Sequence, residues 1–142
     1  MTVSSFTSET RKTTDKVLYI DDSPDRIELI QLIFEHKRND IELQILSGIQ
    51  EGIKITRQEL PTLIIICSYV SDGNAWEFLY QVEDDGALLN IPIVALGGRF
   101  DHWKGDPPQV SPNSPQPNVV LPMPFHVDEL LQAVEQYLPE PS

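Results

Sequence analysis

Short apolar runs alternate along the chain with segments whose apolar residues recur at helical spacing, and this alternation is the strongest constraint on the fold. The apolar runs predict strands at residues 16–20, 41–45, 63–67, 91–96 and 118–121. The helical segments are 24–36, 48–59, 74–85 and 127–138. Because strands joined by right-handed helical crossovers run parallel, the pattern predicts a parallel sheet with helices on both faces.

Residues at the element ends agree with this assignment. Ser23 and Pro24 predict a helix start, because serine caps helices and proline is tolerated at the first helical position. Asn74, with Glu77 three residues later, predicts another capped start. Residues 41–45 alternate apolar and polar side chains, unlike the first and third runs, and are therefore expected at a sheet edge.

Residues 99–117 break the alternation. They contain five prolines and no helical period where a helix is expected, so an irregular segment is predicted there. Residues 1–15 are polar and rich in Ser and Thr, without the apolar stretch of a secretory signal. We expect a disordered tail over 1–15, one domain over 16–138 and a C-terminal tail over 139–142.

The charge and the cysteine count exclude several classes of protein. The chain has 22 acidic and 10 basic residues, a net charge of −12, which argues against binding nucleic acid or anionic lipid. Most of the imbalance lies after residue 58, where Arg99 and Lys104 are the basic residues. A single cysteine excludes an internal disulfide framework, and no apolar run approaches the ~20 residues of a membrane-spanning helix. We expect a soluble cytoplasmic protein.

Functional groups of a parallel sheet gather at the carboxyl ends of its strands. Here YIDD closes the first strand, PTLIIIC precedes a DG turn and WEFL, IPIVALGG forms the fourth strand, and MPF precedes DELLQAV. In this order and spacing the motifs resemble the receiver domain of two-component response regulators over residues 16–138. The resemblance implies a flavodoxin-like (CheY-like) α/β fold, a doubly wound five-stranded parallel sheet with strand order 2-1-3-4-5, in which the proline-rich loop replaces helix four.

The resemblance also implies a phosphorylation site, from which this chain departs. In the family an acid pair helps to hold Mg²⁺, an aspartate ending the third strand accepts the phosphoryl group, and a Ser or Thr and a Lys contact that group. Asp21 and Asp22 match the acid pair. Cys67 stands at the acceptor position, Gly97 at the hydroxyl position and Met123 at the lysine position. The resemblance thus implies a degenerate phosphorylation site.

These departures predict a pseudo-receiver. Acyl-phosphate chemistry is excluded at Cys67, and Val120 replaces the aromatic residue usual at the switch position. Losing both the carboxylate and the lysine is electrostatically consistent, since each charge would have compensated the other. We expect a more apolar pocket that Met123 helps to fill, no catalytic residue, no cofactor and no enzymatic activity. The Met123-Pro124 bond is expected to be cis, as the family's Lys-Pro bond commonly is.

Three residues, Asp21, Asp22 and Cys67, also have more specific functional interpretations. Asp21 and Asp22 are weak candidates for metal binding, because two carboxylates make a poor Mg²⁺ site; we expect no bound metal and place them in the turn before the first helix. Cys67 is a candidate nucleophile or redox sensor, which needs a stabilised thiolate. Adjacent carboxylates and burial disfavour a thiolate, so a small buried residue is expected.

The expected function is signal transduction by a stand-alone, receiver-like module that binds another signalling protein without phosphorylation. No DNA-binding or catalytic output domain fits in the remaining residues. Phe100, His102 and Trp103 are candidate partner-binding residues, because Trp is enriched at interface hot spots and prolines restrain the segment. The acidic surface favours a partner with a basic surface. The alternatives are a phosphorelay receiver with another acceptor and a thiol redox switch at Cys67, and the oligomeric state is left open.

Overall fold

The computed structural model describes residues 15–84, 90–97 and 117–140. Within these ranges, five parallel strands form one sheet with the order β2-β1-β3-β6-β7. The strands are β1 (Asp15–Ile20), β2 (Ile41–Leu46), β3 (Leu63–Cys67), β6 (Ile93–Leu96) and β7 (Val119–Leu121). Numbered along the chain, the sheet has the order 2-1-3-4-5, so the predicted doubly wound fold is confirmed.

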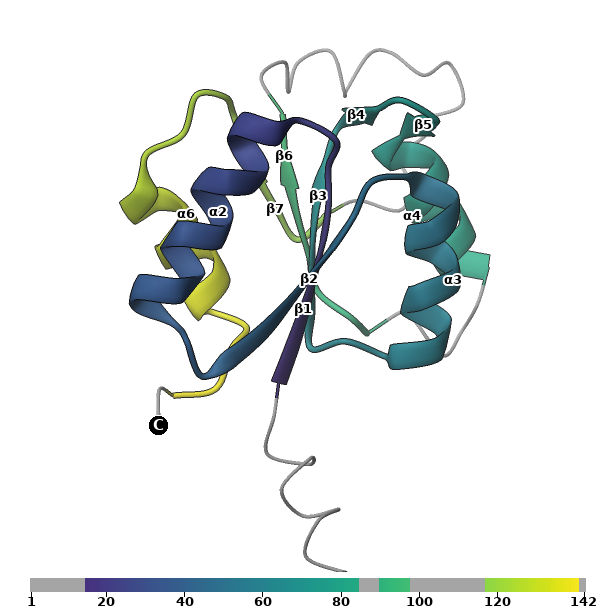
Figure 1. The fold of residues 1–142 in the computed structure, drawn as a ribbon. Coiled ribbons are helices and arrows are strands. Elements are labelled where there is room, and N and C mark those ends of the chain that lie inside the picture. The colour runs from purple at the N-terminus through teal and green to yellow at the C-terminus, as the bar shows by residue number, and fades with distance from the viewer. Residues whose placement is uncertain (1–14, 85–89, 98–116, 141–142) are drawn as a thin grey trace, which may run out of the picture.

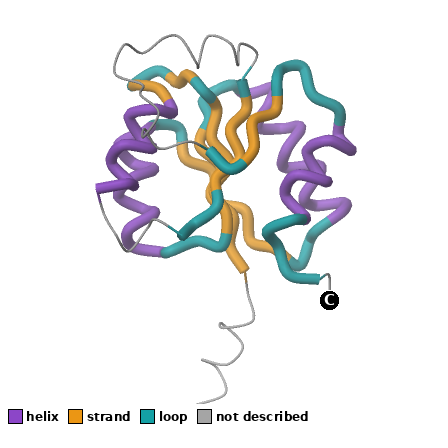
Figure 2. Tube along the Cα trace, turned by 180° about the vertical axis from the view of Figure 1, so that it is seen from behind, coloured by secondary structure: helices purple, strands orange, loops and turns teal. Residues whose placement is uncertain are grey.

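Helices cover both faces of the sheet (Figure 1). On one side lie α2 (Pro24–Lys37) and α6 (Val127–Glu135), and on the other lie α3 (Ile49–Glu59) and α4 (Ala75–Asp84). A short antiparallel hairpin of β4 (Tyr69–Val70) and β5 (Gly73–Asn74) precedes α4. In the reverse view of Figure 2 the strands again form the middle layer between the two helical layers.

The sheet divides the core into two apolar clusters, because successive side chains of a strand point to opposite faces. The cluster under α3 and α4 includes Leu18, Ile20, Ile64, Ile66, Trp76 and Phe78. The cluster under α2 and α6 includes Val17, Tyr19, Ile30, Phe34, Ile65 and Leu130. All of β3 is buried, whereas the edge strand β2 leaves Glu42 exposed, as the two sequence patterns predicted.

Two helix starts have the side-chain caps that the sequence predicted. Ser23 caps α2, and its hydroxyl accepts a hydrogen bond from the N–H of Arg26 at 3.5 Å. At the start of α4, the Glu77 N–H donates to Asn74 Oδ1 at 3.1 Å, and the Asn74 N–H donates to Glu77 Oε1 at 3.4 Å. These reciprocal bonds form a capping box.

Two glycines allow close approaches around α3. Its N-cap residue is Gly48, so the carboxylate of Asp72 supplies the cap and accepts from the Ile49 N–H at 2.7 Å. A Cβ at Gly48 would lie 2.8 Å from an oxygen of Asp72. A Cβ at Gly52 would lie 2.5 Å from Cδ1 of Ile20, so this glycine lets α3 pack closely onto β1.

Several boundaries differ by one to three residues from the sequence prediction, and three of them bear on pairing and packing. β1 begins at Asp15, which therefore belongs to the sheet and not to the predicted tail. β6 begins at Ile93, two residues later than predicted, after Pro92, which has no N–H to donate to a neighbouring strand. α6 ends at Glu135, three residues earlier than predicted. Leu138, in the turn that follows α6, is nevertheless buried in the cluster under α2 and α6.

Several predictions lie outside the described residues. They include most of the irregular segment 99–117, the loss of helix four, and the candidate partner-binding residues Phe100, His102 and Trp103. These stay predictions. In the described ranges, every helix is too short or too polar to cross a membrane.

Candidate functional site

The carboxyl edge of the sheet brings the predicted site residues together. Asp21 directly follows β1, Cys67 ends β3, and Gly97 directly follows β6. The parallel register pairs Ile20 with Ile66, which sets the ends of β1 and β3 side by side. The strand ends therefore assemble one cluster, as expected for this class of sheet.

Asp21 is the centre of a hydrogen-bonded cluster, and its side chain is fully buried. The guanidinium of Arg26, in the first turn of α2, binds both carboxylate oxygens: Nε donates to Oδ2 at 2.7 Å and Nη2 donates to Oδ1 at 2.9 Å. The Tyr19 hydroxyl also donates to Oδ2. The N–H groups of Asp22 and Ser23 donate to Oδ1 at 2.7 Å and 3.1 Å. We call Tyr19, Asp21, Asp22, Ser23 and Arg26 the Asp21 cluster.

The hydrogen bonds of the Asp21 cluster fix its charges. Burial alone would raise the pKa of Asp21, but hydrogen bonds from Arg26, Tyr19 and Ser23 outweigh burial and hold that pKa below its usual value. The hydrogen bonds to Asp21 raise the pKa of Arg26. Burial, followed by the hydrogen bond to Asp21, raises the pKa of Tyr19. At neutral pH the cluster therefore contains a carboxylate, a guanidinium and an uncharged phenol.

Arg26 also reaches the acceptor position. Its Nη2 lies 3.4 Å from Sγ of Cys67. Cys67 is 6% exposed, which confirms its predicted burial. The Arg26 guanidinium therefore connects Asp21, of the acid pair, with Cys67, which the family resemblance aligns with the phosphoacceptor.

The second residue of the acid pair, Asp22, is engaged by the β4–β5 turn. Its Oδ2 accepts hydrogen bonds from the Ser71 N–H, at 2.7 Å, and from the Ser71 hydroxyl. Since the next residue, Asp72, caps α3, the turn joins the end of β1 to the start of α3. Both carboxylates of the acid pair, the weak metal candidates, thus bind the chain's own donors. In the part of the chain that the structure describes, no three or more His, Cys, Asp or Glu residues are grouped so that they could hold a metal.

Gly97 and Met123 are joined through the backbone. The Gly97 N–H donates to the carbonyl of Leu121, and the Met123 N–H donates to the carbonyl of Gly97, both at 3.0 Å. The Met123-Pro124 peptide bond is cis, as predicted. Val120 is half-buried on the other face of the sheet, against the cluster under α3 and α4. These residues connect β6 with the end of β7.

The sequence predicted a more apolar pocket that Met123 helps to fill, without naming a cation in it. The structure places the Arg26 guanidinium between Asp21 and Cys67. Met123 packs half-buried against the cluster under α2 and α6. The physical reason is charge balance: a buried Asp21 carboxylate requires a cation, and Arg26 supplies it from α2.

Sequence reasoning missed Arg26, Tyr19 and Ser71. A signal for Arg26 was present, because a cation in the first turn of a helix faces the positive end of the helix dipole and is unfavourable unless a specific anion binds it. Asp21, five residues earlier, is that anion. Ser71 had no local signal, because its partner Asp22 lies 49 residues away along the chain.

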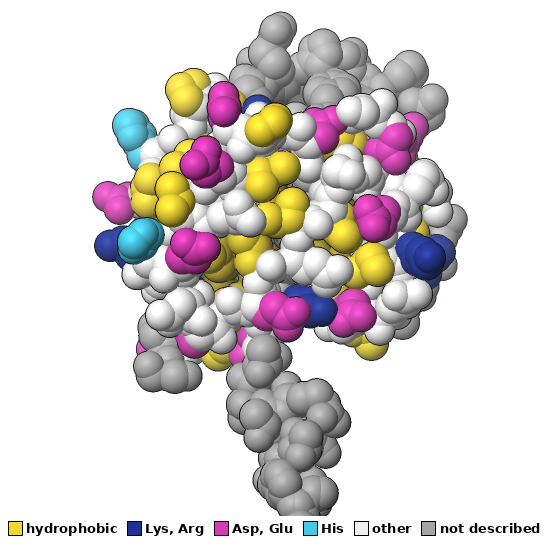
Figure 3. Space-filling model, in the orientation of Figure 1, with side chains coloured by type: hydrophobic (Ala, Val, Ile, Leu, Met, Phe, Trp, Pro, Cys, Tyr) yellow, Lys and Arg dark blue, Asp and Glu magenta, His cyan; other side chains and the backbone are white. Residues whose placement is uncertain are grey.

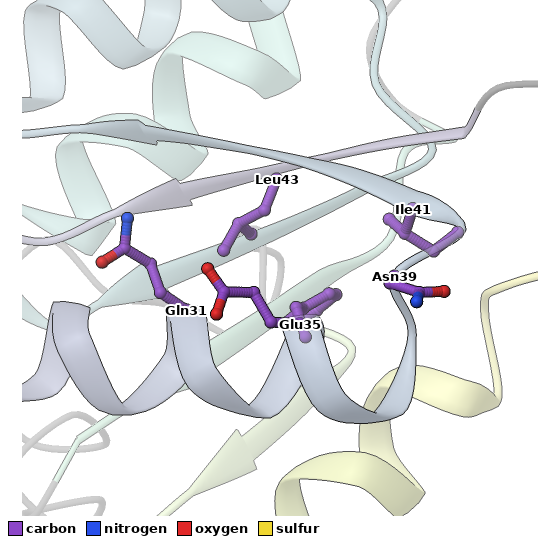
Figure 4. A pocket seen from close by; sticks show the side chains of 6 residues that line it. Gln31, Glu35, Asn39, Ile41 and Leu43 are labelled. Carbon is purple, nitrogen blue, oxygen red and sulfur yellow. The ribbon is translucent and has the colours of Figure 1, made fainter.

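A separate groove lies between α2 and the edge strand β2 (Figure 4). Its volume is about 230 Å³, and its lining includes Gln31 and Glu35 from α2 and Ile41 and Leu43 from β2. None of its lining residues belongs to the Asp21 cluster. The groove is therefore distinct from the candidate site.

No protein-family model and no curated protein matches the sequence. Solved structures do match. The chemotaxis response regulator CheY4 of Vibrio cholerae matches with a TM-score of 0.74 and 19% identity, over 89% of this chain and 100% of that chain. The receiver domain of sensor histidine kinase PA1611 from Pseudomonas aeruginosa PAO1, which has a magnesium ion coordinated in its active site cleft, matches with a TM-score of 0.72 and 14% identity, over 87% and 97%.

The receiver domain of Francisella response regulator 1452 matches with a TM-score of 0.69 and 19% identity, over 87% of this chain and 95% of that chain. At such identities the likeness concerns the fold. The strand order and the two helical layers agree with it independently. The chain has the fold of the CheY-like receiver domains of response regulators.

Proposed function

We propose that this protein is a pseudo-receiver, which acts in signal transduction by binding another protein and is not switched by phosphorylation. The observation that carries the proposal is the bidentate ion pair of Arg26 with the buried Asp21, extended to Cys67. Where a phosphorylated receiver has a metal, a carboxylate acceptor and a lysine, this chain has an internal ion pair. It keeps the receiver fold as a surface for recognition.

The chemistry of the Asp21 cluster supports this proposal. Phosphoryl transfer needs a nucleophile and cations that neutralise the phosphoryl oxygens as charge moves onto them. The thiol of Cys67 is 6% exposed, and the charge of Arg26 is already matched by Asp21. Ser71 engages Asp22, which in the resemblance is a metal ligand. We therefore infer no enzymatic activity and no cofactor.

Treatment with a small phosphodonor tests the proposal. The full chain is incubated with acetyl phosphate and Mg²⁺, and its intact mass is measured, with a phosphorylatable receiver treated in parallel. We expect a mass gain of one phosphoryl group on the control receiver and none on this chain. A stable gain on this chain would overturn the proposal and favour the alternative of a phosphorelay receiver with another acceptor residue.

The thiol-switch alternative is less well supported, because Cys67 is buried and the charge of Arg26, which would favour a thiolate, is already matched by Asp21. Labelling with a thiol reagent at neutral pH, in buffer and in urea, distinguishes a buried, unreactive Cys67 from a reactive one. We expect slow labelling of the folded protein and fast labelling of the unfolded protein. Fast labelling of the folded protein would favour the redox switch.

A further inference from the structure

The edge strand β2 presents backbone groups that point away from the sheet. In the described ranges β2 is the first strand in the sheet order, and its strand partner is β1. The Asp21 N–H donates to the carbonyl of Leu46 at 3.0 Å, so Leu46 directs its backbone groups toward β1. Because this direction alternates along a strand, Leu43 and Ile45 direct their N–H and carbonyl groups away from β1. Such groups are a template for another strand.

The composition of β2 does little to protect this edge. Edge strands are commonly blocked by lysine, by proline, by a bulge or by short length. β2 has six residues in unbroken register with β1 and contains neither lysine nor proline, and Glu42 is its charged residue. The opposite edge strand, β7, has three residues and is followed by Pro122. By length and composition, β2 is therefore the edge better suited to strand pairing.

The side chains on one side of β2 are apolar. Ile41 is buried, and Leu43 and Ile45 are half-buried against the cluster under α2 and α6. Ile41 and Leu43 also line the groove beside α2 (Figure 4). Figure 3, in which β2 faces the viewer, shows apolar side chains in the middle of this face, between the two helical layers. A strand added to β2 would remove this apolar surface from water.

The sequence of β2 is complementary to itself in one antiparallel register. When Leu43 faces Leu43 of the partner subunit, Ile41 faces the partner's Ile45, and Glu42 faces the partner's Gln44. Residues directly opposite share a side of the sheet, so apolar side chains meet on one side, and a carboxylate meets an amide on the other. The same register brings the outward backbone groups of the two strands together as hydrogen-bonded pairs.

The neighbouring registers are less favourable. Only shifts by two residues keep the outward backbone groups of the two strands opposite one another, because their direction alternates. One such shift sets Glu42 against the partner's Glu42, and like charges directly opposite are destabilising. The shift in the other direction sets Glu42 against the partner's Leu46. The register centred on Leu43 is therefore the favoured one.

The charges around β2 also fit a two-fold arrangement. Lys16 Nζ lies 3.6 Å from Glu42 Oε2 and donates to Gln44 Oε1 at 3.1 Å, so a cation lies beside the carboxylate. On α2, Gln31 and Glu35 line the groove one helical turn apart, and the two-fold axis would turn Gln31 toward the partner's Glu35 (Figure 4). The net charge of −12 opposes association, so we expect salt to strengthen it.

We propose that β2 pairs with β2 of a second copy of this chain, in the antiparallel register centred on Leu43, so that the two sheets become one. The outward backbone groups supply the hydrogen bonds, and the partner's Ile45 packs beside Ile41 at the groove. The pairing residues 41–45 lie outside the Asp21 cluster. The inference therefore goes beyond the proposed function and does not depend on it.

Sedimentation equilibrium of the full chain tests the proposal, from about 10 µM to about 1 mM and at about 0.1 and 0.5 M salt, with NMR of the same samples. We expect a monomer–dimer equilibrium that shifts toward the dimer with concentration and with salt. Amide shifts that follow the concentration are expected in residues 41–46 and at Gln31 and Glu35. Shift changes confined to other elements would overturn the proposal. A monomer at every concentration would also overturn it and would favour an extended segment of another protein at this edge.

A matched pair of variants locates the contact. Leu43→Lys sets two lysines opposite each other and is expected to raise the dissociation constant of the dimer at least about tenfold. The control is Leu32→Lys, which changes an exposed leucine of α2 that does not line the groove and is expected to leave the constant unchanged. Far-UV circular dichroism checks that both variants fold. Equal effects of the two substitutions would contradict pairing through β2.

A complementary pair of variants tests the register. Leu43→Lys and Leu43→Glu are each expected to be monomeric, whereas their equimolar mixture is expected to dimerise at least about tenfold more tightly than either alone. The reason is that the register sets residue 43 opposite residue 43, so lysine then faces glutamate. A folded mixture that does not associate would contradict this register. None of these results bears on the phosphodonor experiment, so the strand pairing and the proposed function fail separately.

Discussion

Two arginine–carboxylate clusters lie at opposite ends of α2, and they bury opposite charges. In the Asp21 cluster the carboxylate is 0% exposed, and its partner Arg26 is 30% exposed. In the second cluster Arg38 is 1% exposed, and its partners Asp40 and Glu135 are 23% and 39% exposed. An ion is costly to bury without a partner. The effect of breaking each ion pair on the free energy of unfolding therefore depends on which of its two members is buried.

The second cluster, which we call the Arg38 cluster, joins distant parts of the chain. Arg38 donates to Asp40 Oδ1 and Oδ2 at 3.0 and 2.9 Å, to Glu135 Oε1 at 2.6 Å and to the Pro139 carbonyl at 2.9 Å. The hydrogen bonds to Asp40 raise the pKa of Arg38. These bonds join the end of α2 to the end of α6, away from the carboxyl edge of the sheet. Both clusters contain a bidentate arginine, so the position in the fold, and not the ion pair itself, makes the Asp21 cluster the candidate site.

The largest effect is expected from Arg26→Met. It leaves the buried Asp21 carboxylate without its cation, and we expect the free energy of unfolding at neutral pH to fall by about 3 kcal/mol. Adding Asp21→Asn removes the stranded charge and is expected to restore more than half of the loss. Urea denaturation of the two variants measures both values. If the second substitution adds to the loss, the Asp21 carboxylate is not the group that Arg26 stabilises.

A smaller and different effect is expected from Arg38→Met. The loss of its hydrogen bonds is expected to lower the free energy of unfolding by about 2 kcal/mol. The partners left behind are partly exposed and remain solvated, so adding Asp40→Asn is expected to restore nothing. The same denaturation experiment applies, and a clear recovery would remove the difference between the two clusters.

Acid titration provides a third comparison. Because the folded pKa of Asp21 lies below its unfolded value, its stabilisation is present above the unfolded pKa of about 3.9 and is lost as the pH falls through the folded pKa. In Arg26→Met the cation no longer offsets burial, and we expect the folded pKa of Asp21 to rise above its unfolded value although the hydrogen bonds from Tyr19 and Ser23 remain. Protonating the stranded carboxylate is then favourable. We expect the stability deficit of this variant to shrink as the pH is lowered from 7 toward about 4, by 1 kcal/mol or more. A deficit that stays constant over that range would contradict the assigned charge state.

The last prediction concerns metal binding. Cys67→Asp adds a carboxylate at the acceptor position, but Arg26 lies 3.4 Å from that side chain and is expected to pair with it. Combining Cys67→Asp with Arg26→Ala frees three carboxylate positions, a better oxygen site for a divalent cation. We expect the double variant to bind Mn²⁺ at least about tenfold more tightly than Cys67→Asp alone, by isothermal titration calorimetry. Equal affinities would show that Arg26 does not block the site.

Local patterns accounted for most of the fold. The buried run 63–67, the edge pattern of 41–45 and the cap residues Ser23 and Asn74 each depend on neighbours within a few residues, and each was predicted correctly. Two of the boundaries that were wrong, at Asp15 and at the end of α6, depend on pairing and packing with elements far along the chain.

The candidate site, too, was predicted only in part from the sequence. By itself, the sequence determined that Asp21 and Cys67 lie at the carboxyl edge of a parallel sheet, because hydrophobic periodicity places the strand ends and parallel strands share that edge. The order of the strands was predicted from the family resemblance. Only the tertiary structure decided that Arg26 turns back from α2 to hold both residues and that Ser71 holds Asp22. The reason is physical: a buried charge needs a partner, but sequence spacing does not say which of several cations reaches it.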